Sequence, residues 1–145
     1  MVQRIQSIWL LLAGLINAAL FYLCLYSAHE MINGVDTVTY LRINNQYAIM
    51  LLALVAIFLP LVTIFMFKNR KQQRRMVYLS LLVNMGFIAA VLMLVGNFSN
   101  KTPMPTNGSY NVGAVLPVIA IIFLIMAIRG INKDEKLVKA TDRLR

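Results

Sequence analysis

Residues 68–75, KNRKQQRR, place five basic side chains between two long apolar runs. Because Lys and Arg are retained on the cytoplasmic side of membranes, this stretch predicts an inner loop between two membrane-spanning helices. The loop is short, so the two helices are expected to form an antiparallel hairpin. Outward from this loop, twelve of the fourteen basic residues lie in segments on the same side: Arg4, Lys68, Arg70, Lys71, Arg74, Arg75, Arg129, Lys133, Lys136, Lys139, Arg143 and Arg145. Only Arg42 and Lys101 lie in the two remaining loops.

Four apolar segments alternate with these loops and predict an all-α membrane protein, a single four-helix transmembrane bundle over residues 1–145. The expected spans cover residues 7–27, 47–67, 76–98 and 114–131, with both termini cytoplasmic. The composition agrees, because 13% of the residues are charged, whereas a soluble domain carries about 25%. The net charge of +9 comes without an aromatic-interleaved nucleic-acid motif, so no nucleic-acid partner is expected.

The two outer segments predict different local structures. In residues 28–46, the turn dipeptide Asn33-Gly34 precedes β-branched and aromatic residues that favour a short strand or a hairpin. Such an element is marginally stable alone, so it is expected to rest on the helix ends or on a partner. In residues 99–113, turn formers predominate and two prolines disfavour regular structure.

The basic tail of residues 132–145 predicts a cytoplasmic amphipathic helix that continues beyond the fourth span, because apolar positions repeat on one helical face. The residues expected to contact the inner membrane surface or a partner are Lys133, Lys136, Leu137, Lys139, Asp142, Arg143 and Arg145. Two interpretations stay open. The tail is either a helix end whose basic residues bind anionic lipid at the cytoplasmic face, or a docking segment for a protein.

The central parts of the apolar segments hold no ionisable side chain, which argues against a proton-coupled carrier and against intramembrane acid–base catalysis. The main polar groups there are two Asn residues, and each lies beside a pair of small residues that lets two helices approach closely. The helix-packing residues predicted in this way are Asn17, Asn84, Gly14, Ala18, Gly86 and Ala90. We expect a contact between spans one and three at these residues; the alternative is a polar ligand held by both amides.

His29, Glu30 and Asp36 form the only outer cluster of residue types that serve in catalysis or metal binding. Zinc needs three protein ligands in a catalytic site and four in most structural sites, and these residues lack a recognisable ligand spacing. The chain also lacks a Walker loop and the HExxH, GxSxG and dinucleotide motifs. We therefore expect no catalytic, cofactor-binding or metal site, and no enzyme activity. The single cysteine, Cys24, excludes an intramolecular disulfide.

Three stretches carry a resemblance to a known family: MVQRIQSIWLLLAGLINAALF (1–21), FKNRKQQRR (67–75) and AIRGINKDEKLVKATDRLR (127–145). Together they resemble a bacterial family of small four-span proteins known only as a domain of unknown function. The resemblance covers the whole chain in order, and the terminal KDEKLVKATDRLR is its most specific part. It implies the inner membrane of a Gram-negative cell, and it implies no established activity, ligand or catalytic residue.

Three functions compete on these observations. The first is a non-enzymatic accessory or assembly subunit of a larger inner-membrane complex, with a membrane protein or a second copy as its partner. The second is a small carrier or channel for a neutral or lipid-like solute; it would act as an oligomer, since four helices enclose little lumen. The third, a membrane enzyme, requires His29, Glu30 and Asp36 to converge on one point.

Overall fold

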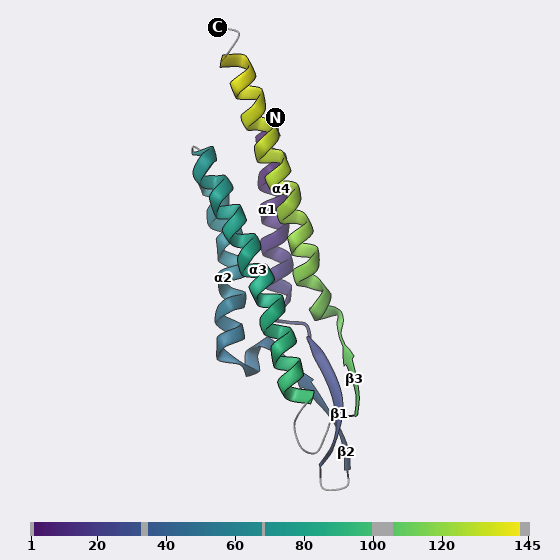
Figure 1. Cartoon of the computed structure of the whole chain (residues 1–145). Coiled ribbons are helices and arrows are strands. Elements are labelled where there is room, and N and C mark those ends of the chain that lie inside the picture. Colours follow the sequence, from purple (N-terminus) through teal and green to yellow (C-terminus); the bar gives the residue numbers. More distant parts are fainter. Residues whose placement is uncertain (1, 33–34, 68, 100–105, 143–145) are drawn as a thin grey trace.

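The computed structural model describes residues 2–32, 35–67, 69–99 and 106–142. Four helices run side by side, and a small sheet extends from one end of them (Figure 1). The helices are α1 (Val2–Ala19), α2 (Tyr47–Phe65), α3 (Arg70–Ser99) and α4 (Val112–Asp142). The strands are β1 (Tyr26–Ile32), β2 (Val35–Leu41) and β3 (Thr106–Tyr110), and a short 3-10 helix, η1 (Ile43–Asn45), precedes α2.

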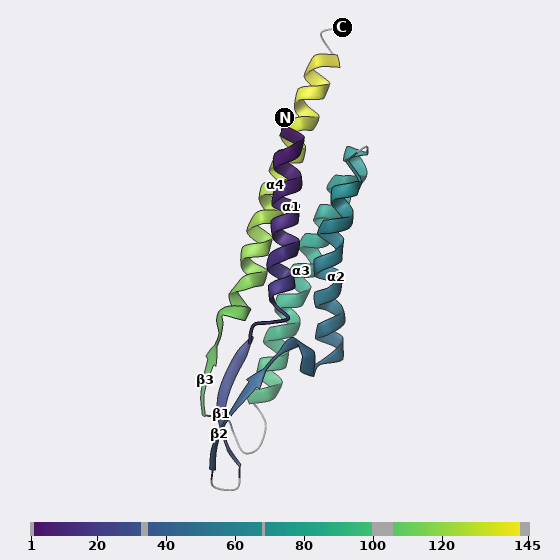
Figure 2. The same cartoon turned by 180° about the vertical axis from the view of Figure 1, so that it is seen from behind.

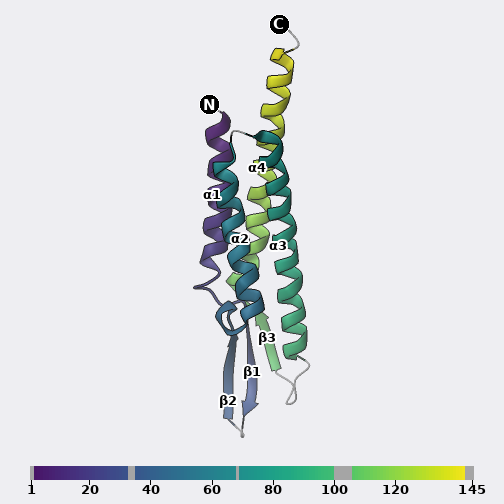
Figure 3. The ribbon, with the colours of Figure 1, turned by 90° about the vertical axis from the view of Figure 1, so that its left-hand side faces the viewer.

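The four helices form a bundle in which α1 packs against α2 and α4, and α3 packs against the same two helices. Therefore α1 and α3 lie at opposite corners, an arrangement that can be followed from two further sides (Figures 2 and 3). Both ends of the chain lie at the end of the bundle remote from the sheet (Figure 1).

Three helices are long and apolar enough to cross a membrane: α2, α3 and the part of α4 over Val112–Glu135. The apolar part of α1, Ile5–Ala19, is shorter. Large apolar side chains point outward from the bundle, and Phe58, Leu82 and Met93 are each more than half exposed. A mostly helical fold with such a surface is compatible with a membrane protein, because lipid tails can cover these side chains.

Helix α1 ends at Ala19, whereas the apolar run predicted a span that continued to Ser27. After Ala19 the chain turns, and the backbone of Leu25 bonds to the backbones of Leu41 and Asn111. Leu20 and Leu25, which follow α1, are buried in one cluster with residues of the sheet and α3 rather than in a helix, whereas Tyr22 is exposed. Hydropathy alone does not distinguish these two ways of burying an apolar run, so the predicted boundary was wrong.

The hairpin expected in the first outer segment is confirmed. Strands β1 and β2 pair antiparallel with a regular register that runs from Tyr26↔Leu41 to Ile32↔Val35. The Asn33-Gly34 turn itself lies outside the described residues. This hairpin is the core of a three-stranded sheet with the order β2-β1-β3.

Strand β3 corrects the expectation of an irregular second outer segment. It pairs antiparallel with β1, and the register shifts between Ser27 and His29, as in a β-bulge. Gly108 lies at this shift, where a Cβ atom would come 1.7 Å from the Tyr26 hydroxyl oxygen. The turn formers therefore belong to a short edge strand, in which glycine leaves room for the Tyr26 ring.

The sheet is fastened to the part of α3 that is remote from the chain ends. Tyr26 and Leu41 share one buried cluster with Val91, Val95 and Phe98. Tyr26 meets Phe98 edge to face, with ring centroids 6.3 Å apart. Since α3 has 30 residues and α1 has 18, α3 is about 18 Å longer at a rise of 1.5 Å per residue. The sheet covers the part of α3 that α1 does not reach.

The start of α4 is held close to the chain that leaves α1. The Gly113 N–H donates a hydrogen bond to the Cys24 carbonyl oxygen at 3.2 Å. A Cβ atom on Gly113 would lie 2.5 Å from the same oxygen. Only glycine permits this backbone approach, which fixes α4 to the base of the sheet.

Helix α3 begins earlier than we expected, whereas helix α4 continues as we expected. Helix α3 begins at Arg70 rather than near Met76, so most of the basic loop is helical. Asn69 caps it, because its Oδ1 accepts from the Gln72 N–H at 3.4 Å, and Lys, Arg and Gln are good helix formers. Helix α4 continues without a break to Asp142, which confirms the helical continuation of the tail.

Candidate functional site

The buried amide of Asn17 completes the hydrogen bonding of α2. Asn17 is fully buried, and its Nδ2 donates to the Ala56 carbonyl oxygen at 3.1 Å. Pro60 lies four residues after Ala56 within α2 and has no N–H, so this carbonyl lacks its ordinary helical partner. Helix α1 thus supplies the donor that the proline removes, and it joins α1 to α2 at the middle of α2.

Asn84 uses its amide within its own helix. Its Nδ2 donates to the Ser80 carbonyl oxygen at 2.9 Å, and both residues are fully buried. The Oδ1 atoms of Asn17 and Asn84 are buried without a hydrogen-bond partner among the described residues. The two amides therefore bond to carbonyls rather than to each other, because α1 and α3 lie at opposite corners. The closer packing that we expected between spans one and three at these residues stays a prediction.

The small-residue pairs serve different helix faces from those expected. Gly14 faces α2, where a Cβ atom would lie 3.1 Å from Leu61 Cδ2, and Ala18 is half-buried. Gly86 is exposed, a Cβ atom on it would have no atom within 4 Å, and Ala90 is half-buried. The first pair packs α1 against α2, whereas Gly86 makes no close helix contact within the described chain, because it points away from the bundle.

A second buried polar pair lies at the end of the bundle that carries both termini. Gln6 and Asp134 are 3% and 7% exposed, and Gln6 Nε2 donates to Asp134 Oδ2 at 2.5 Å. Gly130 lies one turn before Asp134, and a Cβ atom on it would come 2.8 Å from Gln6 Cγ. The glycine lets the Gln6 side chain lie along α4 and reach the carboxylate.

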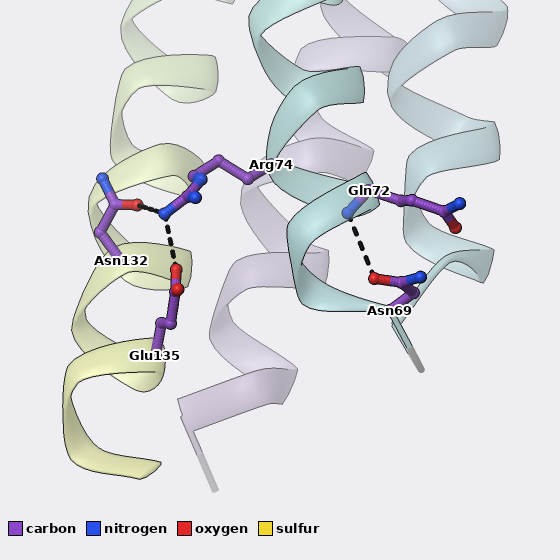
Figure 4. Close-up of polar contacts among 5 residues, drawn as sticks. All are labelled: Asn69, Gln72, Arg74, Asn132 and Glu135. Atoms are coloured by element: carbon purple, nitrogen blue, oxygen red, sulfur yellow. Dashed lines mark hydrogen bonds and ion pairs between the residues drawn. The ribbon is translucent and has the colours of Figure 1, made fainter. Parts of the chain in front are cut away.

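Arg74 joins α3 to α4 at the same end (Figure 4). Its Nη1 lies 2.6 Å from Glu135 Oε2 and donates a longer hydrogen bond, 3.5 Å, to Asn132 Oδ1. Gln73 joins α3 to α2, since its Nε2 donates to the Thr63 carbonyl oxygen at 3.4 Å. At the level where α4 leaves the bundle, polar contacts therefore join α1 to α4, α3 to α4 and α3 to α2.

Beyond these contacts, α4 continues past the ends of the other helices (Figure 1). Lys133 is exposed, and Leu137 is 53% exposed. The other predicted tail residues are not described in their side chains or lie outside the described chain altogether: Lys136, Lys139, Asp142, Arg143 and Arg145. The contact assigned to them stays a prediction.

The outer residues with catalytic chemistry are not gathered into a site among the described residues. His29 pairs with Val38 in the sheet, and Asp36 pairs with Met31, while the Glu30 side chain is not described. The described residues contain no group of three His, Cys, Asp or Glu side chains able to hold a metal ion. The half-buried Cys24 donates from Sγ to the Tyr26 carbonyl oxygen at 3.2 Å.

A groove of about 360 Å³ lies between the far end of α3 and β2. Its lining combines polar and apolar side chains: Thr39, Tyr40, Leu41, Gln46, Leu94, Asn97 and Phe98. A smaller apolar pocket lies between α3 and the start of α4, and it includes Phe87, Val91 and Pro117. The two hollows flank the attachment of the sheet to α3, and neither touches the polar contacts of the bundle.

A family model described as Domain of unknown function (DUF4293) matches residues 2–144. The chain belongs to this family. The match bears out the resemblance of the three quoted stretches to a family of unknown function, and it covers the whole described chain. No curated protein and no solved structure matches the chain.

Several residues of the polar contacts were not singled out from the sequence. Gln6 and Asp134 lie near the two chain ends, where charged and polar residues are ordinarily solvated. Pro60 within an apolar run carries a specific signal, because its missing N–H leaves a carbonyl that a neighbouring helix can satisfy with a donor. Gly130 next to a basic segment gave no hint that it makes room for a side chain of α1.

Proposed function

We propose that this DUF4293 protein is a four-span protein of a bacterial inner membrane, with both termini cytoplasmic. We propose further that it serves as a non-enzymatic accessory or assembly subunit of a larger membrane protein complex. The family, the three long apolar helices and the distribution of basic residues support the membrane placement.

The length of α1 supports a fourth span. Its 18 residues rise about 27 Å, close to the hydrocarbon thickness of about 30 Å. It lies alongside α2 and α4 and donates a hydrogen bond to the middle of α2. Because Asn17 lies two residues before the end of α1 and bonds to the middle of α2, the helix itself ends near that level. The chain that follows it, up to Leu25 at the base of the sheet, would complete the crossing.

The direction of α4 is the observation that carries the accessory role. Gln6 holds Asp134 and Arg74 holds Glu135, so α4 leaves the bundle from a fixed point and at a fixed angle. From Lys133 to Asp142, the end of α4, the helical rise is about 13 Å, whereas the attraction of anionic lipid fades over a Debye length of about 8 Å. The far part of the tail thus suits a protein partner better than a lipid surface.

The polar groups inside the bundle support a structural rather than a chemical role. Asn17, Thr63 and Asn84 each donate to a backbone carbonyl of α2 or α3. The Asn17 bond holds α1 to α2 beside Pro60, whereas the other two bonds lie within a single helix. Side-chain donors that are already bonded to a backbone carbonyl are less suited to binding or transforming a substrate.

The accessory role is tested by gentle solubilisation and purification of the full chain from its native membrane. Lys139→Gln with Arg143→Gln removes two charges from the tail, and Lys71→Gln with Arg75→Gln removes two from the inner loop as a matched control. We expect a stoichiometric membrane protein partner that the tail variant loses and the loop variant keeps. A protein that purifies alone, or a partner that both variants keep, would contradict the docking role of the tail.

The groove beside α3 and β2 favours a second candidate, a carrier for a neutral or lipid-like solute. Its mixed lining suits a molecule with an apolar body and a polar end. Transport would require an oligomer, because four helices enclose little lumen. Flux of labelled lipid-like solutes through proteoliposomes tests it, and a solved oligomer without any polar passage would exclude it.

A further inference from the structure

The polar residues in the middle of the bundle share one layer. On α2, Ala56 lies seven residues before Thr63; on α3, Ser80 lies seven residues after Gln73. Gln73 bonds to Thr63, and the two helices run antiparallel, so Ala56 and Ser80 lie at one level, about 10 Å from that bond. Asn17 bonds to Ala56, so its amide lies at the same level.

Asn84 belongs to the same layer because its Nδ2 donates to the Ser80 carbonyl oxygen. Asn17, Ser80 and Asn84 are all 0% exposed. The layer lies near the middle of α2, since Ala56 is close to the centre of Tyr47–Phe65. If α2 crosses the membrane, this is where lipid and bulk water are least able to satisfy a polar group.

The orientation of both amides is fixed by their partners. A backbone carbonyl only accepts hydrogen bonds, so the atom that faces it must be the amide nitrogen and not the oxygen. The oxygen of each amide therefore points elsewhere in the layer. Both Oδ1 atoms are buried, and neither has a donor among the described residues. Rotating either amide by about 180° would place its oxygen against the carbonyl oxygen, so that two acceptors would face each other.

We infer that water occupies this layer and donates hydrogen bonds to the Oδ1 atoms of Asn17 and Asn84. Buried polar groups without a protein partner are ordinarily satisfied by ordered water with two to four hydrogen bonds. Water suits the layer because each molecule donates two hydrogen bonds and can accept the second Nδ2 hydrogen of an amide. The inference concerns the bundle interior and is independent of the accessory role of the tail.

Solid-state NMR of the full chain in lipid bilayers tests the inference through magnetisation transfer from water to assigned nuclei. The side-chain Nδ2 groups of Asn17 and Asn84 are compared with the buried apolar residues Ala53 and Phe87 and with the exposed Asn44. We expect transfer to the two buried amides to be several-fold faster than to Ala53 and Phe87. Transfer as slow as to those two apolar residues would overturn the inference.

A double variant and a second measurement distinguish water from a bound organic solute as the hydrogen-bond donor to the two Oδ1 atoms. Asn17→Leu with Asn84→Leu removes both acceptors, and the faster transfer should then disappear from the neighbouring Ser80. Faster transfer that persists at Ser80 would place the water elsewhere and overturn the inference. Native mass spectrometry of the unaltered protein should show no discrete organic adduct. An adduct that the double variant loses would assign the layer to a bound solute instead of water.

Discussion

The hydrogen bond from Asn17 to the Ala56 carbonyl predicts that Asn17 and Pro60 are energetically coupled. Asn17→Leu keeps the number and branching of the side-chain heavy atoms but removes Nδ2, so the buried carbonyl loses its donor from α1. Pro60→Ala restores an N–H four residues after Ala56 and returns the ordinary helical partner to this carbonyl. The loss of Asn17 should then matter less.

The magnitude follows from the burial of the bond. Leaving a buried carbonyl unpaired costs about 1–3 kcal/mol in soluble proteins, but hydrogen bonds between membrane helices average about 0.6 and reach about 1.7 kcal/mol. Asn17 and Ala56 are 0% and 1% exposed, which favours the upper part of the membrane range. Asn17→Leu should therefore cost about 1–1.7 kcal/mol more when residue 60 is proline than when it is alanine.

Unfolding of the four proteins of this cycle in mixed micelles of SDS and a mild detergent measures the coupling. The volume lost in Pro60→Ala cancels, because it enters both sides of the cycle. Gln6→Leu combined with Pro60→Ala is the control, since Gln6 bonds to Asp134 on α4, and this pair should be additive within about 0.5 kcal/mol. An equal cost of Asn17→Leu in both backgrounds would refute the reasoning.

Three further substitutions and one control test two close contacts and an ion pair in the same unfolding assay. Gly130→Ala should destabilise the protein by about 1 kcal/mol or more, because the new Cβ would lie 2.8 Å from Gln6 Cγ. This cost should exceed the gain from the higher helix propensity of alanine. A gain in stability would show that Gln6 lies elsewhere. Gly113→Ala should cost about 2–3 kcal/mol, since its Cβ would meet the Cys24 carbonyl at 2.5 Å, whereas Gly96→Ala, which meets no atom within 4 Å, should be neutral or stabilising. Equal effects of these two would argue against the close backbone approach. Arg74→Gln should cost at most about 1 kcal/mol, because the side chain is 35% exposed, and the loss should shrink at high salt; a larger, salt-independent loss would contradict a solvent-screened ion pair.

The parts of the fold that could be predicted are those that one local pattern decides. The apolar length of residues 47–67 identified α2 closely, and Asn33-Gly34 with its β-branched neighbours identified the β1–β2 hairpin. The end of α1 and strand β3 depend instead on distant pairing, as between Leu25 and Asn111. No local pattern encodes the partner of a strand, so hydropathy extended α1 and turn formers concealed β3.

The polar contacts were predictable as residue types but not as pairs. Asn17 and Asn84 stood out because an amide within an apolar run is rare. Their partners did not, because a backbone carbonyl left open by Pro60 carries no side-chain signal. Which helices the two amides can reach also depends on the placement of α1 and α3 at opposite corners of the bundle. That placement follows from the order in which the helices pack around the bundle and not from any single residue.

The central proposal is that α1 and the chain that follows it cross the bilayer beside the other three helices, so that both termini lie on one side, which we propose to be the cytoplasm. The most direct test introduces one cysteine at a time, by Gln3→Cys, Asp36→Cys or Lys139→Cys, into a protein that carries Cys24→Ser. Each variant is then exposed to a membrane-impermeant maleimide. We predict that position 36 reacts in intact spheroplasts, whereas positions 3 and 139 react only in inverted vesicles. Reaction of positions 3 and 36 from the same side would contradict the claim, because α1 would then not cross the membrane.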